Sequence, residues 1–528
     1  MRSFHFPGRS PVYARRAMCA TSHPLASVTA IETLKAGGNA VDAAIAAAGV
    51  LAVVEPHMTG IGGDCFAIVA KPGHKKLIGL NAAGRAPSAA TAAWLEKARL
   101  QRIVETSAHA VTVPGAVDGW CRLLQDHGTM PLARLLAPAI DYAERGFVVA
   151  PRVATDWALH AGRISHHAGA KKHLFKDGAV PRAGEIMRFP ALARTLKTIA
   201  REGREGFYAG EVAKDVVAEL KALGGLHTLA DFEAQRATYV APISVPYRGV
   251  DLCELPPSNQ GIVALMLLRM LEKIGLPKDP VSVERYHVQI EAARLAFAMR
   301  DTFVADPDMA DVPVEHMLSD AVIDNLAKRV QRKRRRNELG ALPQPAGSDT
   351  VYFSIVDEKG MAVSFINSLY DDFGSGIVTA KTGVVLHNRG KGFVCDPTHP
   401  NCIAPRKRPL HTLVPAMVLK AGRPCMAFGV MGAHFQPMGH VYIMSNMFHY
   451  GMDPQEAIDC PRVFFDGDAV LVEESVQAGV VAGLKQLGHG VATRKMPWGG
   501  GQIVVMDRDN GVLIGASDGR KDGLALGY

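Results

Sequence analysis

The residues most suited to carry out a reaction lie where a polar segment ends and a strand pattern begins. Thr350 follows Asp349 and begins the stretch TVYFSIV, and a second hydroxyl, Ser368, ends the next strand pattern. A threonine hydroxyl is a weak nucleophile, and its own α-amino group can serve as the base when the threonine is a chain N-terminus. Thr350 becomes an N-terminus only if its hydroxyl attacks the Asp349 carbonyl and water hydrolyses the resulting ester. Because threonine is also common at strand starts, an ordinary structural role stays open.

The elements around these hydroxyls follow from hydrophobic patterns. Residues 347–376 predict two strands joined by a charged turn. The chain before them is richer in helices. The apolar run Ala40 to Val54 contains Asp42 and is too short to span a membrane, so it predicts a buried helix that Asn39 caps. Helices are also expected over 262–275 and 283–306.

Composition narrows the possible classes of protein. The chain has 528 residues, 48% hydrophobic and 21% charged, which is typical of a globular protein. Its net charge of +8 is a weak signal over this length, and Arg332 to Arg336 is interpreted as a solvated helix end that leads into a linker. We therefore expect no nucleic-acid partner. The N-terminus lacks an apolar signal region, and no apolar run reaches about 18 residues, so we expect a cytoplasmic protein without a membrane span.

The cysteines favour neither a metal site nor a disulfide framework. Eight cysteines occur, without a CxxC motif, and they are interpreted as reduced thiols. A loop disulfide between Cys395 and Cys402 is the alternative. No metal or organic cofactor is expected, because amide chemistry needs only a nucleophile, an amine base and oxyanion donors.

Several motifs, in one consistent order over nearly the whole chain, resemble the γ-glutamyltransferase family of N-terminal nucleophile hydrolases. They are HPLASVTAIETLKAGGNAVDAAIAAAGVLAVVEPHMTGIGGDCFAIV, VPGAVDGW, TLADF, PPSNQG, FVADPD, DTVYFSIVDEKGMAVSFINSLYDDFGSG, NCIAPRKRPLHTLVPAMV, FGVMGAHFQPMGH and GASDGRKDGLALGY.

The resemblance implies a fold and a processing event. The fold would be an α/β (α+β) four-layer αββα sandwich, with two stacked, mainly antiparallel sheets between layers of helices. Self-cleavage between Asp349 and Thr350 would produce a large segment, residues 1–349, and a small one, residues 350–528. The two segments would interleave in a single domain and stay associated, and a dimer of the processed heterodimer is conceivable.

The resemblance also assigns catalytic positions. Thr350 matches the nucleophile, and Ser368 matches a second hydroxyl, usually threonine, that hydrogen-bonds it. Gly432 and Ala433 match a Gly-Gly pair whose backbone N–H groups form the oxyanion hole. Alanine replaces glycine at the second position but keeps the N–H donor.

The positions that hold a γ-glutamyl group in the family differ here. Ala83 stands where the family has an arginine for the substrate α-carboxylate, with Arg85 two residues on. Tyr370 replaces an asparagine. Arg389 and Gly392 replace the amide and acidic residues, so the acid that would hold the substrate α-ammonium group is missing.

Other replacements add polar or cationic groups. A Ser-Ser pair is His411-Thr412 in this chain, and His434 follows Ala433. The candidate substrate-binding residues are Arg85, Tyr370, Arg389, His411, Thr412 and His434. A missing charge partner in a desolvated site costs several kcal/mol, so a zwitterionic γ-glutamyl group should bind poorly.

We therefore expect an amide hydrolase that acts on small carboxylate-bearing amides, as oxamate amidohydrolases and glutaryl-type acylases related to the family do. A true γ-glutamyltransferase or glutathione hydrolase is the first alternative. An unprocessed relative that acts as a binding protein is the second, and the intact Thr350 and Ser368 speak against it.

Overall fold

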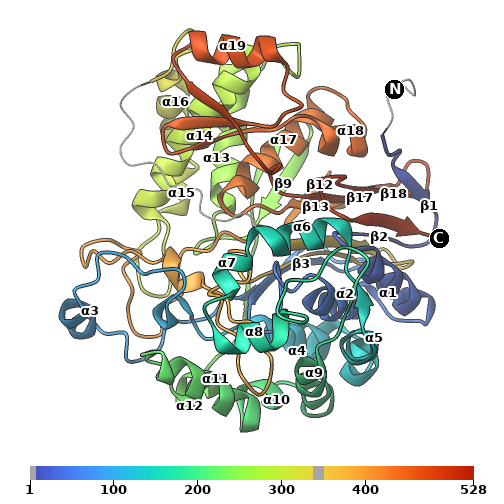
Figure 1. Cartoon of the computed structure of the whole chain (residues 1–528). Helices are drawn as coiled ribbons and strands as arrows, with labels where there is room; N and C mark the ends of the chain where they lie inside the picture. The colour runs from blue at the N-terminus through green and yellow to red at the C-terminus, as the bar shows by residue number, and fades with distance from the viewer. Residues whose placement is uncertain (1–7, 337–349) are drawn as a thin grey trace.

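In the computed structural model, which describes residues 8–336 and 350–528, two seven-stranded antiparallel sheets are stacked between layers of helices (Figure 1). Strand β10 of one sheet packs against β13 and β17 of the other. The expected four-layer αββα sandwich is thus confirmed.

The first sheet combines strands from both ends of the chain. Its order is β1 (Val12–Ala14), β18 (Val512–Ser517), β17 (Gly501–Asp507), β13 (Arg423–Val430), β12 (Ala416–Lys420), β9 (Val250–Glu254) and β8 (Ile243–Tyr247).

The second sheet carries the two hydroxyls identified in the sequence. Its order is β19 (Leu524–Gly527), β2 (Met18–Thr21), β10 (Val351–Val356), β11 (Ala362–Ser368), β3 (Asp64–Ala70), β4 (Ile78–Ala82) and β7 (Thr238–Val240). Strands β10 and β11 form the expected hairpin, and both lie between strands that precede position 349. The expected large and small segments therefore contribute strands to the same hydrogen-bonded sheet, with the β10–β11 pair flanked on both sides by strands of the large segment.

Helices cover the outer face of each sheet. On the second sheet, α2 packs against β10 and β11 with every residue buried, and the Asn39–Asp42 capping box fixes its start as expected. The helices on this side are α1 (Pro24–Lys35), α2 (Ala40–Val54), α4 (Ala116–His127), α5 (Leu132–Arg145) and α9 (Pro190–Glu202). On the first sheet lie α13 (Gly261–Ile274), α14 (Val283–Phe303), α17 (Gln436–Phe448) and α18 (Pro454–Asp459).

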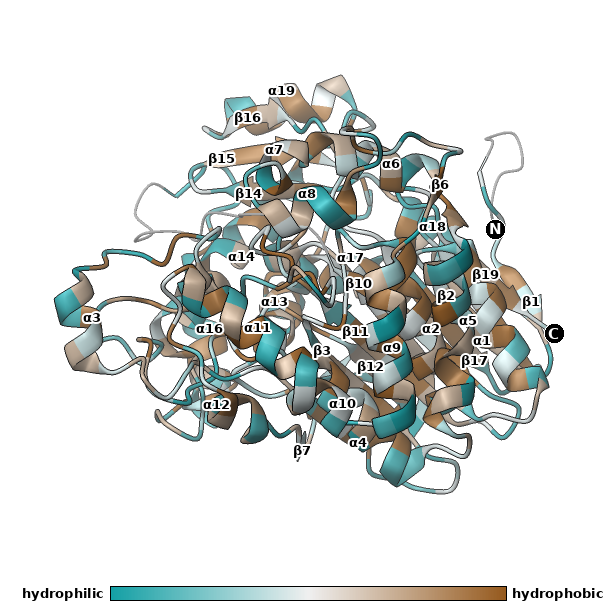
Figure 2. Ribbon diagram, turned by 60° about the horizontal axis from the view of Figure 1, so that its bottom comes forward, coloured by the Kyte–Doolittle hydropathy of each residue, from teal (hydrophilic) through white to brown (hydrophobic). Residues whose placement is uncertain are grey.

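Hydrophobic residues, brown along the ribbon of Figure 2, concentrate in the central strands and helices, and polar residues gather toward the periphery. The remaining elements surround this core. They are α3 (Ala92–Ala98), η1 (Ala108–Ala110), β5 (Phe147–Val148), α6 (Pro151–Leu159), α7 (Ala161–Ile164), α8 (Ala168–Leu174), β6 (Ile186–Met187), α10 (Glu205–Tyr208), α11 (Gly210–Ala222), α12 (Leu229–Glu233), α15 (Val314–Met317), α16 (Asp320–Arg329), η2 (Arg389–Gly392), η3 (Ala433–Phe435), β14 (Val463–Asp466), β15 (Ala469–Val472), α19 (Ala478–Gln486) and β16 (Gly490–Thr493).

The arginine cluster is solvated, as the sequence interpretation has it, but it lies just beyond the helix end. Helix α16 ends at Arg329, and the side chains of Arg332, Lys333 and Arg334 beyond it are exposed. Arg332 pairs with Glu284 at 2.6 Å, and the Arg336 N–H donates to Glu291 at 2.9 Å. Acidic side chains of α14 thus contact both ends of this exposed segment.

Three other expectations can be compared with the structure. The linker 337–349, with Asp349, lies outside the described residues. Within the described ranges, no helix combines the length and apolar character that crossing a membrane requires. The eight cysteines are free thiols, including Cys395 and Cys402.

Candidate active site

The two candidate hydroxyls meet at one end of the β10–β11 hairpin. Thr350 precedes β10, and Ser368 is the last residue of β11; both side chains are buried. The Thr350 hydroxyl donates to Ser368 Oγ over 3.0 Å, and the Tyr370 N–H donates to the same oxygen over 2.8 Å. Strand pairing alone brings the hydroxyls together, because Val351 and Asn367 are register partners.

A glycine-rich turn before β3 supports Ser368 by close backbone approach. A Cβ atom on Gly63 would lie 2.3 Å from the Ser368 carbonyl oxygen, and one on Gly62 would lie 2.2 Å from the Val385 carbonyl oxygen. Only glycine fits at such distances. The sequence GIGGD therefore fixes the backbone behind the second hydroxyl.

The candidate oxyanion donors lie in a tight turn between a strand and a helix. Strand β13 ends at Val430, and η3 begins at Ala433 and leads into α17. Gly432 has φ 118° and Ala433 has φ 46°, so both occupy the left-handed region. An alanine there costs about 1–2 kcal/mol, which neighbouring contacts must offset. N–H groups at the start of a helix have no intrahelical acceptor and can face a substrate.

Arg389 is a buried cation with one unused hydrogen-bonding edge. Its Nη1 donates to Thr412 Oγ1 over 2.7 Å, and its guanidinium carbon lies 3.9 Å from the Tyr370 ring centroid. Burial lowers the pKa of Arg389 to about 10, so it remains charged at neutral pH. Nε and Nη2, which form the side-on edge of the guanidinium, have no hydrogen-bond partner among the described residues. This edge matches the geometry of a carboxylate.

A second cation flanks the same tyrosine. Lys391 Nζ lies 4.6 Å from the Tyr370 ring centroid and forms an ion pair with Asp371. Tyr370 itself has φ 83°, a backbone conformation that turns the chain sharply after Ser368. Sequence reasoning missed Lys391, although its spacing two residues after Arg389 could have identified it.

His434 reaches the hydroxyl end of Tyr370. Arg300, a buried residue of α14, donates to His434 Nδ1 over 2.8 Å, and His434 Nε2 lies 3.4 Å from the Tyr370 hydroxyl. Burial and then Arg300 lower the pKa of His434 well below its usual value. The ring is therefore neutral, with its hydrogen on Nε2. Arg300 carries no local sequence signal, because it lies more than a hundred residues before His434.

Both ring nitrogens of His411 are hydrogen-bonded to protein atoms. Nε2 donates to Asp64 Oδ2 over 3.0 Å, and Nδ1 accepts from the Leu413 N–H. Burial and then Arg389 lower the pKa of His411 to about 3, so the neutral ring adds no positive charge. Asp64 is the register partner of Ser368 and also accepts the N–H groups of Gly84 and Gly115.

Arg85 lies in a different cluster. Its guanidinium pairs with Asp308 at 2.9 Å and donates to the Arg406 carbonyl oxygen, also at 2.9 Å. It lines a pocket of about 260 Å³ whose other residues are Ala86, Val113, Asp231, Ala234, Gln235 and Arg406. Ala83 is buried, and its carbonyl oxygen accepts from Gln235. The guanidinium of Arg85 is thus committed to protein partners.

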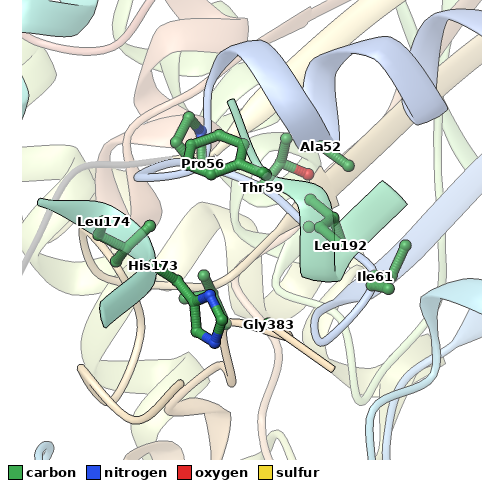
Figure 3. A pocket seen from close by; sticks show the side chains of 11 residues that line it. Ala52, Pro56, Thr59, Ile61, His173, Leu174, Leu192 and Gly383 are labelled. Atoms are coloured by element: carbon green, nitrogen blue, oxygen red, sulfur yellow. The ribbon is translucent and has the colours of Figure 1, made fainter. Parts of the chain in front are cut away.

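A small cavity behind the glycine-rich turn is too small for a substrate. Its volume is about 20 Å³, and Figure 3 shows that its walls are mostly apolar. Thr59 Oγ1 lines it and accepts from Asn367 Nδ2 over 2.7 Å, so the cavity lies beside the support of β11. The lining residues are Ala52, Pro56, Thr59, Gly60, Ile61, His173, Leu174, Phe189, Leu192, Gly383 and Val385.

The whole chain is similar to proteins of known class. It is 36% identical to the glutathione hydrolase-like YwrD proenzyme of Bacillus subtilis, over 98% of this chain and 99% of that protein. It is also 36% identical to the oxamate amidohydrolase proenzyme of Klebsiella pneumoniae, over 97% and 98%.

The fold has an equally close match. The crystal structure of cephalosporin acylase from Bacillus halodurans superposes with a TM-score of 0.92 at 38% identity, covering 100% of this chain and 99% of that one. The model of the gamma-glutamyltranspeptidase family matches residues 26–528. The chain therefore belongs to the gamma-glutamyltranspeptidase family.

Proposed function

We propose that this chain is a self-processing amide hydrolase whose nucleophile, after cleavage between Asp349 and Thr350, is the N-terminal Thr350. Relatives named as hydrolases support the reaction class, and the same relatives, named as proenzymes, support the processing. The 3.0 Å contact between Thr350 and Ser368 supports the choice of nucleophile. The fragments 1–349 and 350–528 would form one active unit.

The proposed chemistry proceeds through an ester. Thr350 Oγ attacks the substrate amide carbonyl while its own α-amine takes the hydroxyl proton. The N–H groups of Gly432 and Ala433 stabilise the oxyanion. The protonated amine then passes its proton to the leaving amine, and an acyl ester of Thr350 remains. Water hydrolyses this ester and restores the hydroxyl.

The substrate class is inferred from Arg389. A buried guanidinium with an unpartnered side-on edge favours a ligand with one carboxylate, which it can hold bidentately. Lys391 also lies over the Tyr370 ring, but its charge is paired with that of Asp371, so the assignment rests on Arg389. We therefore propose acyl groups that bear a carboxylate but no α-ammonium group, such as oxamate and glutaryl amides. Because Arg85 and His411 face protein partners, neither is assigned direct contact with that carboxylate.

The test compares oxamate, glutaryl and γ-glutamyl amides at equal concentrations of processed protein. We expect the first two to have higher kcat/KM than the γ-glutamyl amide, and Arg389→Ala to abolish most of the preference. Arg204→Ala is a matched control, because Arg204 is a partly buried arginine whose Nε donates to Asp118 Oδ1 over 2.7 Å, outside the candidate site. Higher kcat/KM for γ-glutamyl amides, or an unchanged ranking in Arg389→Ala, would overturn the proposed substrate class.

One observation favours γ-glutamyl transfer as the second candidate. Asp371 Oδ1 is buried without a hydrogen-bond partner among the described residues, and a carboxylate is what a substrate ammonium group needs. Lys391 and Arg163 already offset the charge of Asp371, however. The same comparison of substrates decides between the two candidates.

A further inference from the structure

Gln260 occupies an unusual position between two parts of the candidate site. It directly precedes α13 and is fully buried, but its side chain does not cap that helix. Its Nε2 instead donates to the carbonyl oxygens of Thr412, over 3.0 Å, and Ala433, over 2.8 Å. Its Oε1 accepts from Arg300 Nη1 over 2.7 Å. Both amide hydrogens and the amide oxygen are therefore in use.

The bond to Ala433 restrains the candidate oxyanion turn. Ala433 holds a left-handed conformation that alanine adopts only under constraint. The direction of its carbonyl group is fixed by the ψ angle of Ala433. The hydrogen bond from Gln260 to this carbonyl oxygen therefore limits rotation about ψ, next to the proposed donor N–H groups. An oxyanion hole depends on donors that are fixed before the charge develops.

The bond to Thr412 restrains the candidate carboxylate clamp. The same residue whose carbonyl oxygen accepts from Gln260 offers its hydroxyl to Arg389. A shift of the Thr412 backbone would move that hydroxyl and turn the guanidinium. The Gln260 side chain thus contacts the backbone of the proposed oxyanion turn, at Ala433, and the backbone beside the proposed carboxylate clamp, at Thr412.

A ring of contacts closes on the opposite side. Arg300 donates to both Gln260 and His434, His434 reaches the Tyr370 hydroxyl, and Tyr370 stacks under Arg389. Arg389 then returns to Gln260 through Thr412. Because the members other than the partly exposed His434 are buried, displacing one of their contacts leaves its partners without solvent to replace it.

We infer that Gln260 is a positioning residue that couples recognition of the acyl carboxylate to stabilisation of the oxyanion. This inference rests on the proposed function and extends it: the carboxylate that Arg389 holds also fixes, through Thr412 and Gln260, the turn that carries Gly432 and Ala433. A residue that only supports the fold would affect all substrates equally, whereas a coupling residue affects the carboxylate-bearing ones most.

The test measures discrimination in the processed protein. A glutaryl amide is compared with a pentanoyl amide, which has the same chain length without the carboxylate. In Gln260→Met, which keeps the volume but removes the hydrogen bonds, we expect kcat to fall for both substrates and the kcat/KM ratio of glutaryl to pentanoyl amide to fall by about tenfold. Gln289→Met is the control, because Gln289 is buried with its amide atoms unpartnered among the described residues.

Two further measurements keep the inference falsifiable. Gln260→Glu retains the shape but sets a carboxylate against two carbonyl oxygens, and it should lower the ratio as well. In an Arg389→Ala background, Gln260→Met should no longer change the ratio. A wild-type ratio near one would overturn the proposed substrate class itself. A high wild-type ratio that Gln260→Met and Gln260→Glu leave unchanged would overturn the coupling alone.

Discussion

Thr350 Oγ1 lies 3.0 Å from Ser368 Oγ, across the open end of a hairpin whose neighbours, β2 and β3, come from the first seventy residues of the chain. The contact is buried, so water does not compete for it. It joins Thr350, which would become a new N-terminus, to Ser368, whose backbone packs against the glycine-rich turn. The predictions on processing and association start from this pair.

Thr350→Ala should remain a single chain, because a methyl group cannot attack the Asp349 carbonyl. The wild type should resolve on a denaturing gel into residues 1–349 and 350–528, with Thr350 at the new N-terminus by N-terminal sequencing. Thr350→Ser keeps a hydroxyl and should still be cut. A wild type that stays intact after long incubation, or a cut elsewhere, would contradict the prediction.

Ser368→Ala should slow both self-cleavage and turnover while the fold survives. It removes a hydrogen bond to the nucleophile, a loss of roughly 10²-fold in rate when the bond strengthens in the transition state. Single-turnover rates on isolated processed protein measure this effect. Ser364→Ala is the control on the same strand, because Ser364 bonds the Tyr352 hydroxyl instead. Equal rates in the two variants would remove Ser368 from the reaction.

The two fragments should stay together without a covalent link. Strand β10 of the second fragment pairs with β2 of the first, and β9 of the first pairs with β12 of the second. Separation would expose strand edges and core residues of both sheets. We expect one peak containing both fragments in size-exclusion chromatography under native conditions and two peaks only in denaturant; two native peaks would contradict this interleaving.

Stability should fall as the pH drops below the ordinary histidine range. Burial lowers the pKa of His227 to about 4 in the folded state, whereas an unfolded histidine has a pKa of about 6.5. Between these values the unfolded chain binds more protons than the folded one. The free energy of unfolding therefore decreases, by on the order of 3 kcal/mol for this residue, as the pH is lowered through this range. The contribution is complete above about pH 6.5.

Thermal unfolding at pH 7.5 and pH 5 checks this prediction. His227→Gln can still donate to the Val111 carbonyl oxygen, as His227 Nε2 does over 3.0 Å, but it has no proton to gain. Its Tm should therefore change less between the two pH values than that of the wild type. His74→Gln, at an exposed position, should behave as the wild type does. An identical pH response in His227→Gln would exclude His227 as the source.

Local patterns in the sequence predicted much of the framework. The apolar run that forms α2, its cap at Asn39 and the β10–β11 hairpin follow from periodicity and capping, which depend on near neighbours. The four-layer sandwich was predicted from the family resemblance that the order of motifs carries. Thr350 and Ser368 were identified as a pair because their strands are adjacent in the chain, and the absence of an acid at Gly392 was visible directly.

Tertiary structure decided what each polar side chain contacts. Arg85 and Arg389 looked alike in the sequence, yet Arg85 is paired with Asp308, whereas Arg389 keeps an open edge over Tyr370. His411 looked like an added cation, but burial beside Arg389 makes it neutral. Long side chains have many rotamers, and their charge depends on burial and on partners far away in the chain. The link from Gln260 to Ala433 spans 173 positions, so only the packed fold could reveal it.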